Sequence, residues 1–331
     1  MAPCVSTGPF CCPKNEPANM TASQIPQEIL LQRHRALSVR VGNTPLIALP
    51  SLTEDLGPDV TIMAKLEWHQ IGGSVKARAA HAILGEALVD PKFHGKRLLD
   101  ASSGNTGIAY GAICAALGIP LTLCLPSNAS PERKRILEAL GVEIISTSPY
   151  EGTDGAQAEC RSIMEAQDDR YYYLDQYGHP ANRRAHYHGT AGEIWMQTGG
   201  EVTHFVAGLG TTGTFNGTTT RLKEFNPDIQ CIAFQPESAL HGLEGWKHLE
   251  TADVPAIHDH SIADEHRTVS TESAYEMVVD IANNEGLLIS PSAGANLAAA
   301  RSVAEELDRG TIVTTLADDA SKYGEVMAQL F

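Results

Sequence analysis

One lysine stands where an amine could do chemistry on a small molecule. Lys76 lies in the stretch EWHQIGGSVKARAA, after two glycines and a serine and between a strand-like run and a helix-like run. Small residues let a ligand approach the backbone, and a lysine amine that is shielded from water can act as a nucleophile. An ordinary solvated charge near the start of a helix is the alternative interpretation of Lys76.

The first of three loops rich in Gly, Ser and Thr suits a carboxylate. It reads ASSGNTG, residues 101–107, and lies between a strand-like run and an Ala-rich helix-like run. The N–H groups at a helix start carry partial positive charge, and the Ser103 and Thr106 hydroxyls add further donors. A capped helix start without any ligand is the alternative for this loop.

The second loop suits a phosphate. It reads GLGTTGT, residues 208–214, and again joins a strand-like run to a helix-like run. Backbone amides at such a turn can surround a phosphate group. Further hydroxyl donors would come from Thr211, Thr212 and Thr214.

The same loop also raises a rival from another reaction class. It matches G-x-G-x-x-G at Gly208, Gly210 and Gly213, and Glu237 follows the next strand, where a ribose-binding acid is expected in nicotinamide dehydrogenases. However, the loop lies in the second half of the chain, past Lys76. Its threonines suit one phosphate better than a pyrophosphate, so the dehydrogenase is the weaker alternative.

The third loop, ISPSAGAN at residues 289–296, offers the hydroxyl of Ser292 at another helix start. Taken alone, Ser292 could simply cap that helix. Together, a lysine, a carboxylate loop, a phosphate loop and this hydroxyl are the parts needed to hold pyridoxal phosphate and an amino acid. The combination therefore favours the catalytic interpretation of Lys76.

The elements that must position these residues alternate along the chain. Such alternation of strand and helix predicts parallel sheets with helices on both faces, and 331 residues suffice for two α/β lobes. In such sheets ligands bind beyond the carboxyl ends of the strands, where the three loops fall. Strands are expected at 60–68, 96–102, 120–126, 142–148, 201–210, 228–236 and 311–318, and helices at 26–37, 75–88, 106–118, 130–141, 214–225, 272–286 and 297–307.

Composition excludes some classes of partner. The chain has 24 Lys and Arg against 40 Asp and Glu, a formal charge of −16 that repels nucleic acid and anionic lipid. No apolar run is long enough to cross a bilayer, and the N-terminus lacks the pattern of a secretory signal. We therefore expect a soluble, cytoplasmic protein.

The seven cysteines include no C-x-x-C pair, and no metal site is predicted from them. Four of them fall singly in apolar or helical context and are expected in the core, namely Cys114, Cys124, Cys160 and Cys231. The other three, Cys4, Cys11 and Cys12, lie in a Pro- and Ser-rich tail, where we expect incidental thiols.

Seven motifs reveal a family resemblance. They occur in the order and spacing of cysteine synthases (O-acetylserine sulfhydrylases), which belong to the tryptophan synthase β-like enzymes of fold type II. The resemblance covers residues 38–326, and GTTGT and QYGHPAN resemble the B-type enzymes. The motifs are VGNTPL, GGSVKAR, SSGNTG, QYGHPAN, GTAGEIW, GLGTTGT and SAGAN.

The resemblance implies a two-lobed, three-layer α/β/α fold, and it implies that pyridoxal 5′-phosphate is the cofactor. We expect a flexible extension at 1–24, a larger domain from 25–70 and 186–331, and a smaller domain at 71–185 that carries the Schiff-base lysine and the substrate loop. The family is usually a homodimer. A sulfur-carrier protein and serine acetyltransferase are the partners it suggests.

The family's roles can be carried onto matching positions. Lys76 would bear the Schiff base, Asn105 would contact the cofactor's ring hydroxyl, and Ser292 would meet the pyridine nitrogen. The phosphate would be held by Gly210, Thr211, Thr212, Gly213 and Thr214. The substrate carboxylate would be held by Ser102, Ser103, Gly104, Thr106 and Gln176.

The implied reaction makes L-cysteine from an O-activated serine and a sulfide donor through an α-aminoacrylate. A serine at the pyridine nitrogen leaves the ring a weaker electron sink than a carboxylate would, which favours rapid β-elimination. Three alternatives stay open: another nucleophile, as in cyanoalanine or diamino-acid synthesis; a serine or threonine dehydratase; and a cofactor-binding scaffold that docks a partner.

The chain departs from the family pattern before and after the lysine. Gln70, Ile71 and Gly72 replace the usual Asn-Pro-Thr/Ser, and Ala77 replaces a common aspartate. These changes leave open whether O-acetylserine or O-phosphoserine is the donor, with O-acetylserine favoured. A phosphate donor would want a cation near residues 235–249, which His241, Lys247 or His248 could supply, although all three suit an exposed loop equally well.

Overall fold

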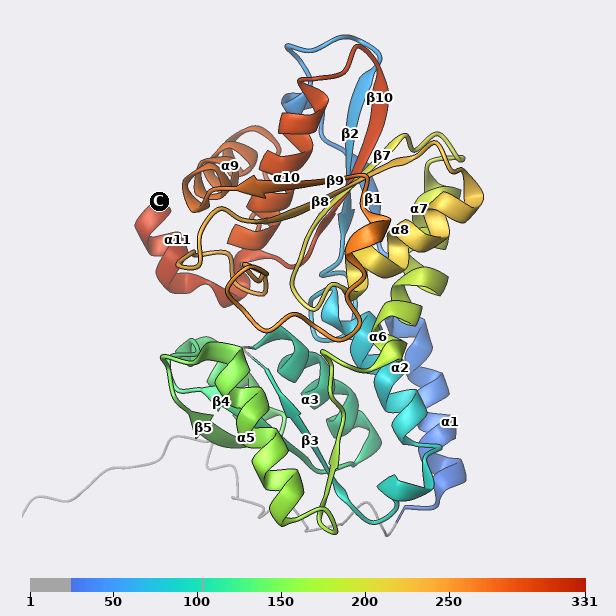
Figure 1. Cartoon of the computed structure of the whole chain (residues 1–331), viewed down its shortest axis with the longest axis vertical. Coiled ribbons are helices and arrows are strands. Elements are labelled where there is room, and N and C mark those ends of the chain that lie inside the picture. The colour runs from blue at the N-terminus through green and yellow to red at the C-terminus, as the bar shows by residue number, and fades with distance from the viewer. Residues whose placement is uncertain (1–24, 103) are drawn as a thin grey trace, which may run out of the picture.

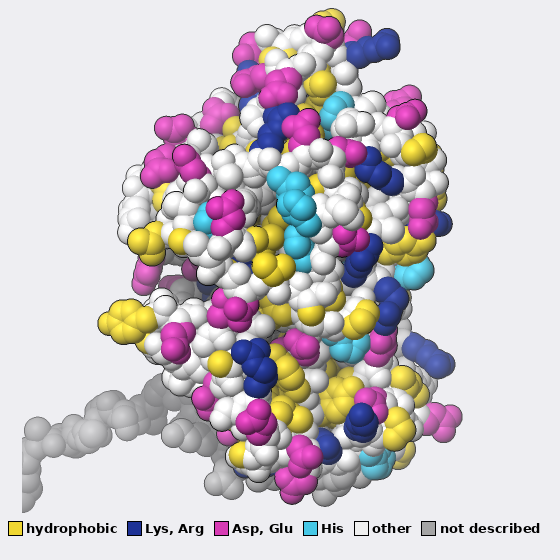
Figure 2. All heavy atoms as spheres, viewed as in Figure 1, with side chains coloured by type: hydrophobic (Ala, Val, Ile, Leu, Met, Phe, Trp, Pro, Cys, Tyr) yellow, Lys and Arg dark blue, Asp and Glu magenta, His cyan; other side chains and the backbone are white. Residues whose placement is uncertain are grey.

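The computed structural model describes residues 25–102 and 104–331; the predicted extension at 1–24 and Ser103 lie outside the described residues. Figure 1 shows two lobes, each built around its own sheet. Acidic side chains are spread over both lobes on the face seen in Figure 2, where no large basic patch occurs. Within the described residues, no helix has the length and apolar character needed to cross a membrane.

The larger lobe holds a six-stranded sheet in the order β1-β2-β10-β7-β8-β9. Its strands are β1 (Leu46–Ala48), β2 (Val60–Leu66), β7 (His204–Gly208), β8 (Gln230–Pro236), β9 (Glu265–Val269) and β10 (Gly310–Leu316). All neighbours are parallel except β1 and β2, so the expectation of a purely parallel sheet is wrong at this edge. The connection from β1 to β2 carries only a short 3₁₀ turn, too little for the crossover that parallel pairing needs.

Helices cover both faces of this sheet. Figure 1 shows α9 (Thr271–Asn284) and α10 (Pro291–Ala304) on one side and α7 (Ala191–Gln197) and α8 (Gly213–Phe225) on the other. Alternate side chains of β7 enter the two cores: Val206 packs with α9 and α10, whereas Phe205 and Ala207 pack with α7 and α8. Helix α11 (Gly324–Leu330) ends the chain.

The smaller lobe holds a four-stranded parallel sheet in the order β5-β4-β3-β6. Its strands are β3 (Arg97–Ala101), β4 (Leu121–Pro126), β5 (Glu143–Thr147) and β6 (Tyr171–Tyr173). Its helices are α2 (Lys76–Ala87), α3 (Asn105–Leu117), α4 (Pro131–Ala139) and α5 (Gly152–Ala166), and α6 (Pro180–Ala185) leads back to the larger lobe. The three-layer α/β/α arrangement is therefore present in both lobes.

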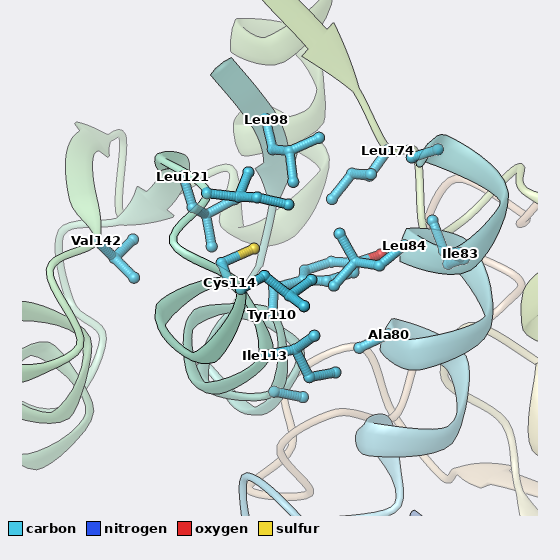
Figure 3. Close-up of a cluster of buried hydrophobic side chains, with 14 of the residues drawn as sticks. Ala80, Ile83, Leu84, Leu98, Tyr110, Ile113, Cys114, Leu121, Val142 and Leu174 are labelled. Atoms are coloured by element: carbon cyan, nitrogen blue, oxygen red, sulfur yellow. The ribbon is translucent and has the colours of Figure 1, made fainter. Parts of the chain in front are cut away.

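The main core of the smaller lobe gathers around Tyr110, which is fully buried (Figure 3). Leu84 reaches it from α2, and Leu98 from β3. Helix α1 (Gln27–Leu37) adds Leu30 to the same core, although the predicted domains assign residues 25–70 to the larger lobe. The four cysteines expected in the core are buried, as predicted.

Local signals place the helix ends correctly in the smaller lobe. The Ser130 hydroxyl accepts from the N–H of Arg133 at 3.4 Å and so caps α4. Gly118 ends α3 with φ of 76°, a conformation that favours glycine. These ends orient the helices that carry two sides of the site described below.

A buried ion network ties α2 to the larger lobe. Arg78, which is 3% exposed, pairs with Glu67 after β2 (2.6 Å) and with Glu193 on α7 (2.7 Å), and Lys65 also pairs with Glu193 (2.7 Å). Burial alone would raise the pKa of Glu193, but Arg78 and Lys65 lower it to about 2. The network fixes the first turn of α2, and hence the backbone of Lys76, relative to β2.

We predict that Arg78→Met destabilises the fold by about 3–5 kcal/mol, because it leaves buried carboxylates without their partner. Urea unfolding followed by circular dichroism measures the change. Arg301→Met is the matched control: its partner Asp55 is 70% exposed, so a loss of about 0–1 kcal/mol is expected. Equal losses in the two variants would contradict a special role for the buried network.

Candidate active site

A pocket between the two lobes brings together most of the predicted site residues. It lies beyond the carboxyl ends of β3, β7 and β10, as expected for such sheets. Its lining includes Lys76, Asn105, Thr106, Gln176, Gly210, Thr211, Thr212, Thr214 and Ser292. Of the other predicted residues, Ser102, Gly104 and Gly213 lie behind this lining, and Ser103 is outside the described residues.

Lys76 is the first residue of α2 and faces the pocket. Burial lowers the pKa of its amine, although the carboxylates of Asp318 and Glu67 act in the opposite direction. A lowered pKa leaves more of the amine neutral near pH 7, and a neutral amine is the nucleophilic form. This environment supports the interpretation of Lys76 as a catalytic residue.

Asn105 is the first residue of α3 and is held from the opposite lobe. Its Nδ2 donates to Asp318 Oδ2 at 2.8 Å, and the Tyr323 hydroxyl donates to the same oxygen at 2.9 Å. The Asn105 Oδ1 is buried without a hydrogen-bond partner among the described residues. Buried polar atoms are rarely left unpaired, so this oxygen is positioned to meet a ligand.

Asp318 and Tyr323 were missed by the sequence analysis. Both follow β10, in the segment DDASKY, and Asp318 is fully buried beside the pocket. The signal that could have found them is their place after the carboxyl end of a parallel strand, which also marks the three predicted loops. Their segment contains no glycine-rich stretch to draw attention.

The carboxylate loop is shaped by its own hydroxyls and by Gln176. The Ser102 Oγ accepts from the N–H groups of Gly104 (3.0 Å) and Gly107 (2.9 Å), so it braces the turn. The Thr106 hydroxyl donates to Gln176 Oε1 at 2.7 Å. Asn105 and Thr106 at the start of α3 line the pocket beside Gln176, and a helix start is a setting that suits a carboxylate.

The second loop joins β7 to α8 in a tight turn. Thr212 adopts φ of 66°, and its buried hydroxyl has no partner among the described residues. A side chain at Gly210 would place its Cβ 2.0 Å from the carbonyl oxygen of Gly245, so only glycine fits there. With the start of α8 directly behind it, this turn can hold an anion.

Two side chains, Asn182 and His186, lie next to the phosphate loop. Asn182 is held by hydrogen bonds, and the His186 ring is uncharged. Asn182 donates through Nδ2 to the carbonyl of Gln176 (2.8 Å) and to Thr211 Oγ1 (3.0 Å), so it links the segment of Gln176 to the phosphate loop. The His186 ring lies 3.3 Å from the Thr214 hydroxyl. Burial and then the Arg78 cation lower the pKa of His186 to about 3, so the ring stays uncharged near pH 7.

Ser292 lies in the first turn of α10, which begins at Pro291 rather than at the predicted residue 297. The cap of this helix is Ser290, whose hydroxyl accepts from the N–H of Ala293 at 3.2 Å. The alternative that Ser292 is the cap is therefore wrong. Its hydroxyl, 3.2 Å from that of Ser290, is left to face the pocket.

The proposed cations near residues 235–249 do not line this pocket. Lys247 forms a salt bridge with Asp154 and lies with His241 in a neighbouring cavity, while the His248 ring lies 3.9 Å from Glu250. Besides Lys76, the basic residue among the described residues that lines the pocket is Arg133, and Glu244 lines it too. Sequence reasoning missed Arg133, because nothing in SPERKR distinguishes one basic residue from the next.

These observations define a class: an enzyme that holds a phosphorylated small molecule beside a lysine, between two α/β lobes. The chain matches the family of pyridoxal-phosphate dependent enzymes over residues 37–318 and belongs to it. This confirms the resemblance, the fold class and the cofactor predicted from the motifs. The nicotinamide alternative is wrong, and Glu237 is exposed and outside the pocket lining.

Named relatives of this chain also support the resemblance to cysteine synthases. The chain is 46% identical over 289 residues to a cysteine synthase of Aquifex aeolicus, covering 86% of this chain and 88% of that protein. It is 36% identical over 286 residues to cysteine synthase B of Pseudomonas aeruginosa, covering 86% and 93%. The solved O-acetylserine dependent cystathionine β-synthase of Helicobacter pylori superposes with a TM-score of 0.81 at 31% identity, covering 87% and 96%.

The residues present fit pyridoxal phosphate. The pocket combines a lysine amine of lowered pKa, a loop at a helix start for the phosphate, and a serine hydroxyl at another helix start. Two buried polar atoms without partners, Asn105 Oδ1 and Thr212 Oγ1, belong to segments to which the motifs assign cofactor contacts. A bound cofactor would supply the groups that these atoms lack.

We predict that Lys76 is the residue bonded to the cofactor. Borohydride reduction of the loaded enzyme followed by peptide mass spectrometry should find the added mass on Lys76, and Lys76→Ala should lower turnover by at least about 10²-fold. Lys134→Ala on α4 is the control, since Lys134 is bonded to the carbonyl of Ser127 outside the pocket. Label on another lysine, or normal turnover without Lys76, would contradict the assignment.

A second prediction concerns Asp100, which lies under the carboxylate loop. Its oxygens accept from the N–H groups of Ala101 (2.8 Å) and Gln176 (3.3 Å), and burial raises its pKa to about 8. The folded state therefore binds a proton that the unfolded state has lost between about pH 4 and pH 8. Stability from this group should fall as pH rises through that window.

Asp100→Asn should remove this dependence. The difference in unfolding free energy between wild type and variant should change by up to about 1.4 kcal/mol per pH unit between pH 5 and 8, the value for one proton. Chemical denaturation at several pH values measures it. Asp169→Asn, at an exposed position before β6, is the control, and a pH-independent difference for Asp100→Asn would rule out the buried protonated carboxyl.

Proposed function

We propose that this chain makes L-cysteine from O-acetyl-L-serine and a sulfide donor, with pyridoxal phosphate bonded to Lys76. The observation that carries the proposal is one pocket that holds Lys76, the carboxylate loop and the phosphate loop in a member of this family. The cysteine synthases among its relatives, at 46% and 36% identity, support the choice of reaction.

Three groups of residues would hold the cofactor. The turn from Gly210 to Thr214 would surround the phosphate with N–H groups at the start of α8. Asn105 would meet the ring hydroxyl, and Ser292 the pyridine nitrogen. When bound, the cofactor supplies an electron sink for the α-carbon of the substrate.

The substrate carboxylate would lie at the start of α3. Residues 102–106 form this site in the proposal, with Gln176 closing its side. The partial charge of the helix start and several N–H donors favour a carboxylate there. This contact orients the α-carbon toward Lys76, which is the positioning that the reaction needs.

Lys76 would act as the base at the α-carbon of the bound amino acid. Its neutral amine would take the proton from Cα, and acetate would leave Cβ with the electron pair of the Cβ–O bond. After a sulfur nucleophile has added to Cβ, the same amine would return the proton to Cα. The lowered pKa of Lys76 favours the neutral form that can accept this proton.

The assembly, location and division of the chain complete the proposal. We propose a cytoplasmic homodimer, with 25–70 and 186–331 as the larger domain and 71–185 as the smaller one. Serine acetyltransferase and a sulfur-carrier protein are the candidate partners. These points rest on the family resemblance, and the packing of α1 on the smaller lobe argues for moving α1 into that domain.

A second candidate nucleophile is homocysteine. The H. pylori structure at 31% identity is an O-acetylserine dependent cystathionine β-synthase, and its reaction differs from cysteine formation only in the thiol that adds. The same Lys76 chemistry would serve both. Cyanide, an amine or water as the final nucleophile would give the remaining alternatives.

Product analysis separates these candidates. The loaded enzyme is incubated with O-acetylserine and one nucleophile at a time, namely sulfide, homocysteine, cyanide, an amine or buffer alone, and products are identified by mass spectrometry. We expect cysteine with sulfide at the highest kcat/KM. Cystathionine formation that exceeds cysteine formation would replace the proposal with its homocysteine form, and pyruvate alone would indicate a dehydratase.

A further inference from the structure

Asp318 is a carboxylate to which none of the assigned roles gives a task. It is fully buried, and its Oδ2 accepts from Asn105 Nδ2 at 2.8 Å and from the Tyr323 hydroxyl at 2.9 Å. Its Oδ1 has no hydrogen-bond partner among the described residues. A carboxylate is costly to bury, so a side chain of this kind directly behind the pocket points to a function.

The backbone around Asp318 joins two further segments of the site. The Asp318 carbonyl accepts from the N–H of Ser290 at 3.3 Å, at the start of the helix that carries Ser292. The carbonyl of Ala317 accepts from the N–H of Val75 at 2.8 Å, one residue before Lys76. Asp318 is therefore held at a fixed place relative to the lysine and to the start of α10.

The side chain of Asp318 decides which end of the Asn105 amide is left for a ligand. Asn105 Nδ2 donates to Asp318 and also lies 3.5 Å from the Tyr323 hydroxyl, so the NH₂ group is directed away from a ligand. With the amide turned over, its oxygen would lie against the Asp318 oxygen, and two acceptors cannot bond to each other. The unpaired Oδ1 of Asn105 is consequently the end that meets a ligand.

Asp318 also acts on Lys76 through its charge. The Asp318 and Glu67 carboxylates raise the pKa of Lys76, whereas the Lys322 cation lowers it together with burial. Lys322 Nζ lies 3.6 Å from Asp318 Oδ2. A second cation, Arg133, lies beyond the tyrosine that bonds to Asp318, 4.7 Å from its ring centre. Asp318 and Lys322 thus have opposite effects on a proton at the Lys76 nitrogen.

We propose that Asp318 is a positioning residue: it turns the acceptor end of the Asn105 amide toward the ring hydroxyl of the cofactor, and its charge retains a proton on the lysine-bound cofactor. This inference rests on the proposed function, which supplies the contacts of Asn105 and Lys76 with the cofactor. An acceptor beside the ring hydroxyl favours the form that keeps its hydrogen, and a nearby carboxylate favours a positive charge on the Lys76 nitrogen. Both effects act in the same direction.

The retained proton matters for the exchange of Lys76 with the amine of the substrate. A protonated nitrogen draws electrons from the carbon to which it is bonded, so the incoming amine attacks that carbon more readily. Asp318 would promote this exchange through Asn105 and through its charge, without contact with the substrate.

A pH titration of the absorbance spectrum of the loaded enzyme, without substrate, tests the proposal. The band of the lysine-bound cofactor changes when the proton is lost, and the midpoint of the change gives its pKa. Asp318→Asn removes the charge but keeps an oxygen that can accept from Asn105, and it should lower the midpoint by about 1 pH unit or more. Asp318→Leu also frees the Asn105 amide to turn its NH₂ group toward the ring oxygen, and it should lower the midpoint further.

Two further variants separate this role from a general loosening of the site. Lys322→Met leaves Asp318 in place without its nearest cation and should raise the midpoint, the opposite sign, even if Asp318→Leu fails to bind the cofactor. Asp319→Asn is the matched control, because it removes a charge from the adjacent residue, outside the pocket lining. The Asp319 carboxylate accepts from the N–H of Ser321 at 3.0 Å in its own turn, so the midpoint should stay as in the wild type.

Product analysis of the same variants distinguishes failure of this inference from failure of the proposed function. Midpoints that shift as expected in an enzyme that forms no cysteine would support the role of Asp318 and contradict the proposed reaction. Midpoints of Asp318→Asn and Asp318→Leu that equal the wild-type value, or a lower midpoint in Lys322→Met, would overturn the assignment of Asp318 whatever product is formed.

Discussion

The partial burial of the Lys76 amine in the pocket between the lobes is the constraint on which the rest of the site depends. Burial lowers the pKa of the amine, but two carboxylates, Asp318 and Glu67, would restore its charge if it were their partner. Each of them is bonded elsewhere: Glu67 to Arg78, and Asp318 to Asn105 and Tyr323. Asp318 also pairs with Lys322 at 3.6 Å, and among the described residues neither carboxylate forms an ion pair with the Lys76 amine.

The same bonds hold the two lobes in register. Arg78 on α2 reaches Glu67 and Glu193 in the larger lobe, and Asn105 on α3 reaches Asp318 after β10. The pocket needs this alignment because its carboxylate loop and its phosphate loop come from different lobes. A small change in lobe orientation would misalign a substrate held by the carboxylate loop with a cofactor held by the phosphate loop.

Local patterns predicted much of this fold. Caps such as Ser130, glycines such as Gly118 and the alternation of strands and helices indicate elements that the structure contains. Several elements were not predicted. The strands β1 and β6 have three residues, and the helices α6, α7 and α11 have one or two turns, which is too few residues to show a period. The longer elements β9 (EHRTV) and α5 (GTDGAQAECRSIMEA) are polar at their start. The antiparallel edge at β1 depends on pairing, which no local signal encodes.

Some residues of the site could likewise be predicted from the sequence, and others could not. Lys76 and the loops could be found because Gly, Ser and Thr at strand ends form contiguous motifs. Asp318 and Tyr323 could not, because they reach Asn105 from positions 213 and 218 residues further along the chain. Arg133 could not either, because its place depends on the ion pair between α4 and Glu244. The choice of Ser292 over Ser290 as the pocket residue likewise depended on where α10 begins.

The most direct test of the central claim is the absorbance spectrum of the purified, cofactor-loaded protein during titration with O-acetylserine. If Lys76 is the residue that holds the cofactor, the band of the lysine-bound cofactor will fall as O-acetylserine is added and return once sulfide is supplied. A spectrum that O-acetylserine leaves unchanged at saturating concentration would contradict the account of Lys76 as the residue that exchanges with this substrate.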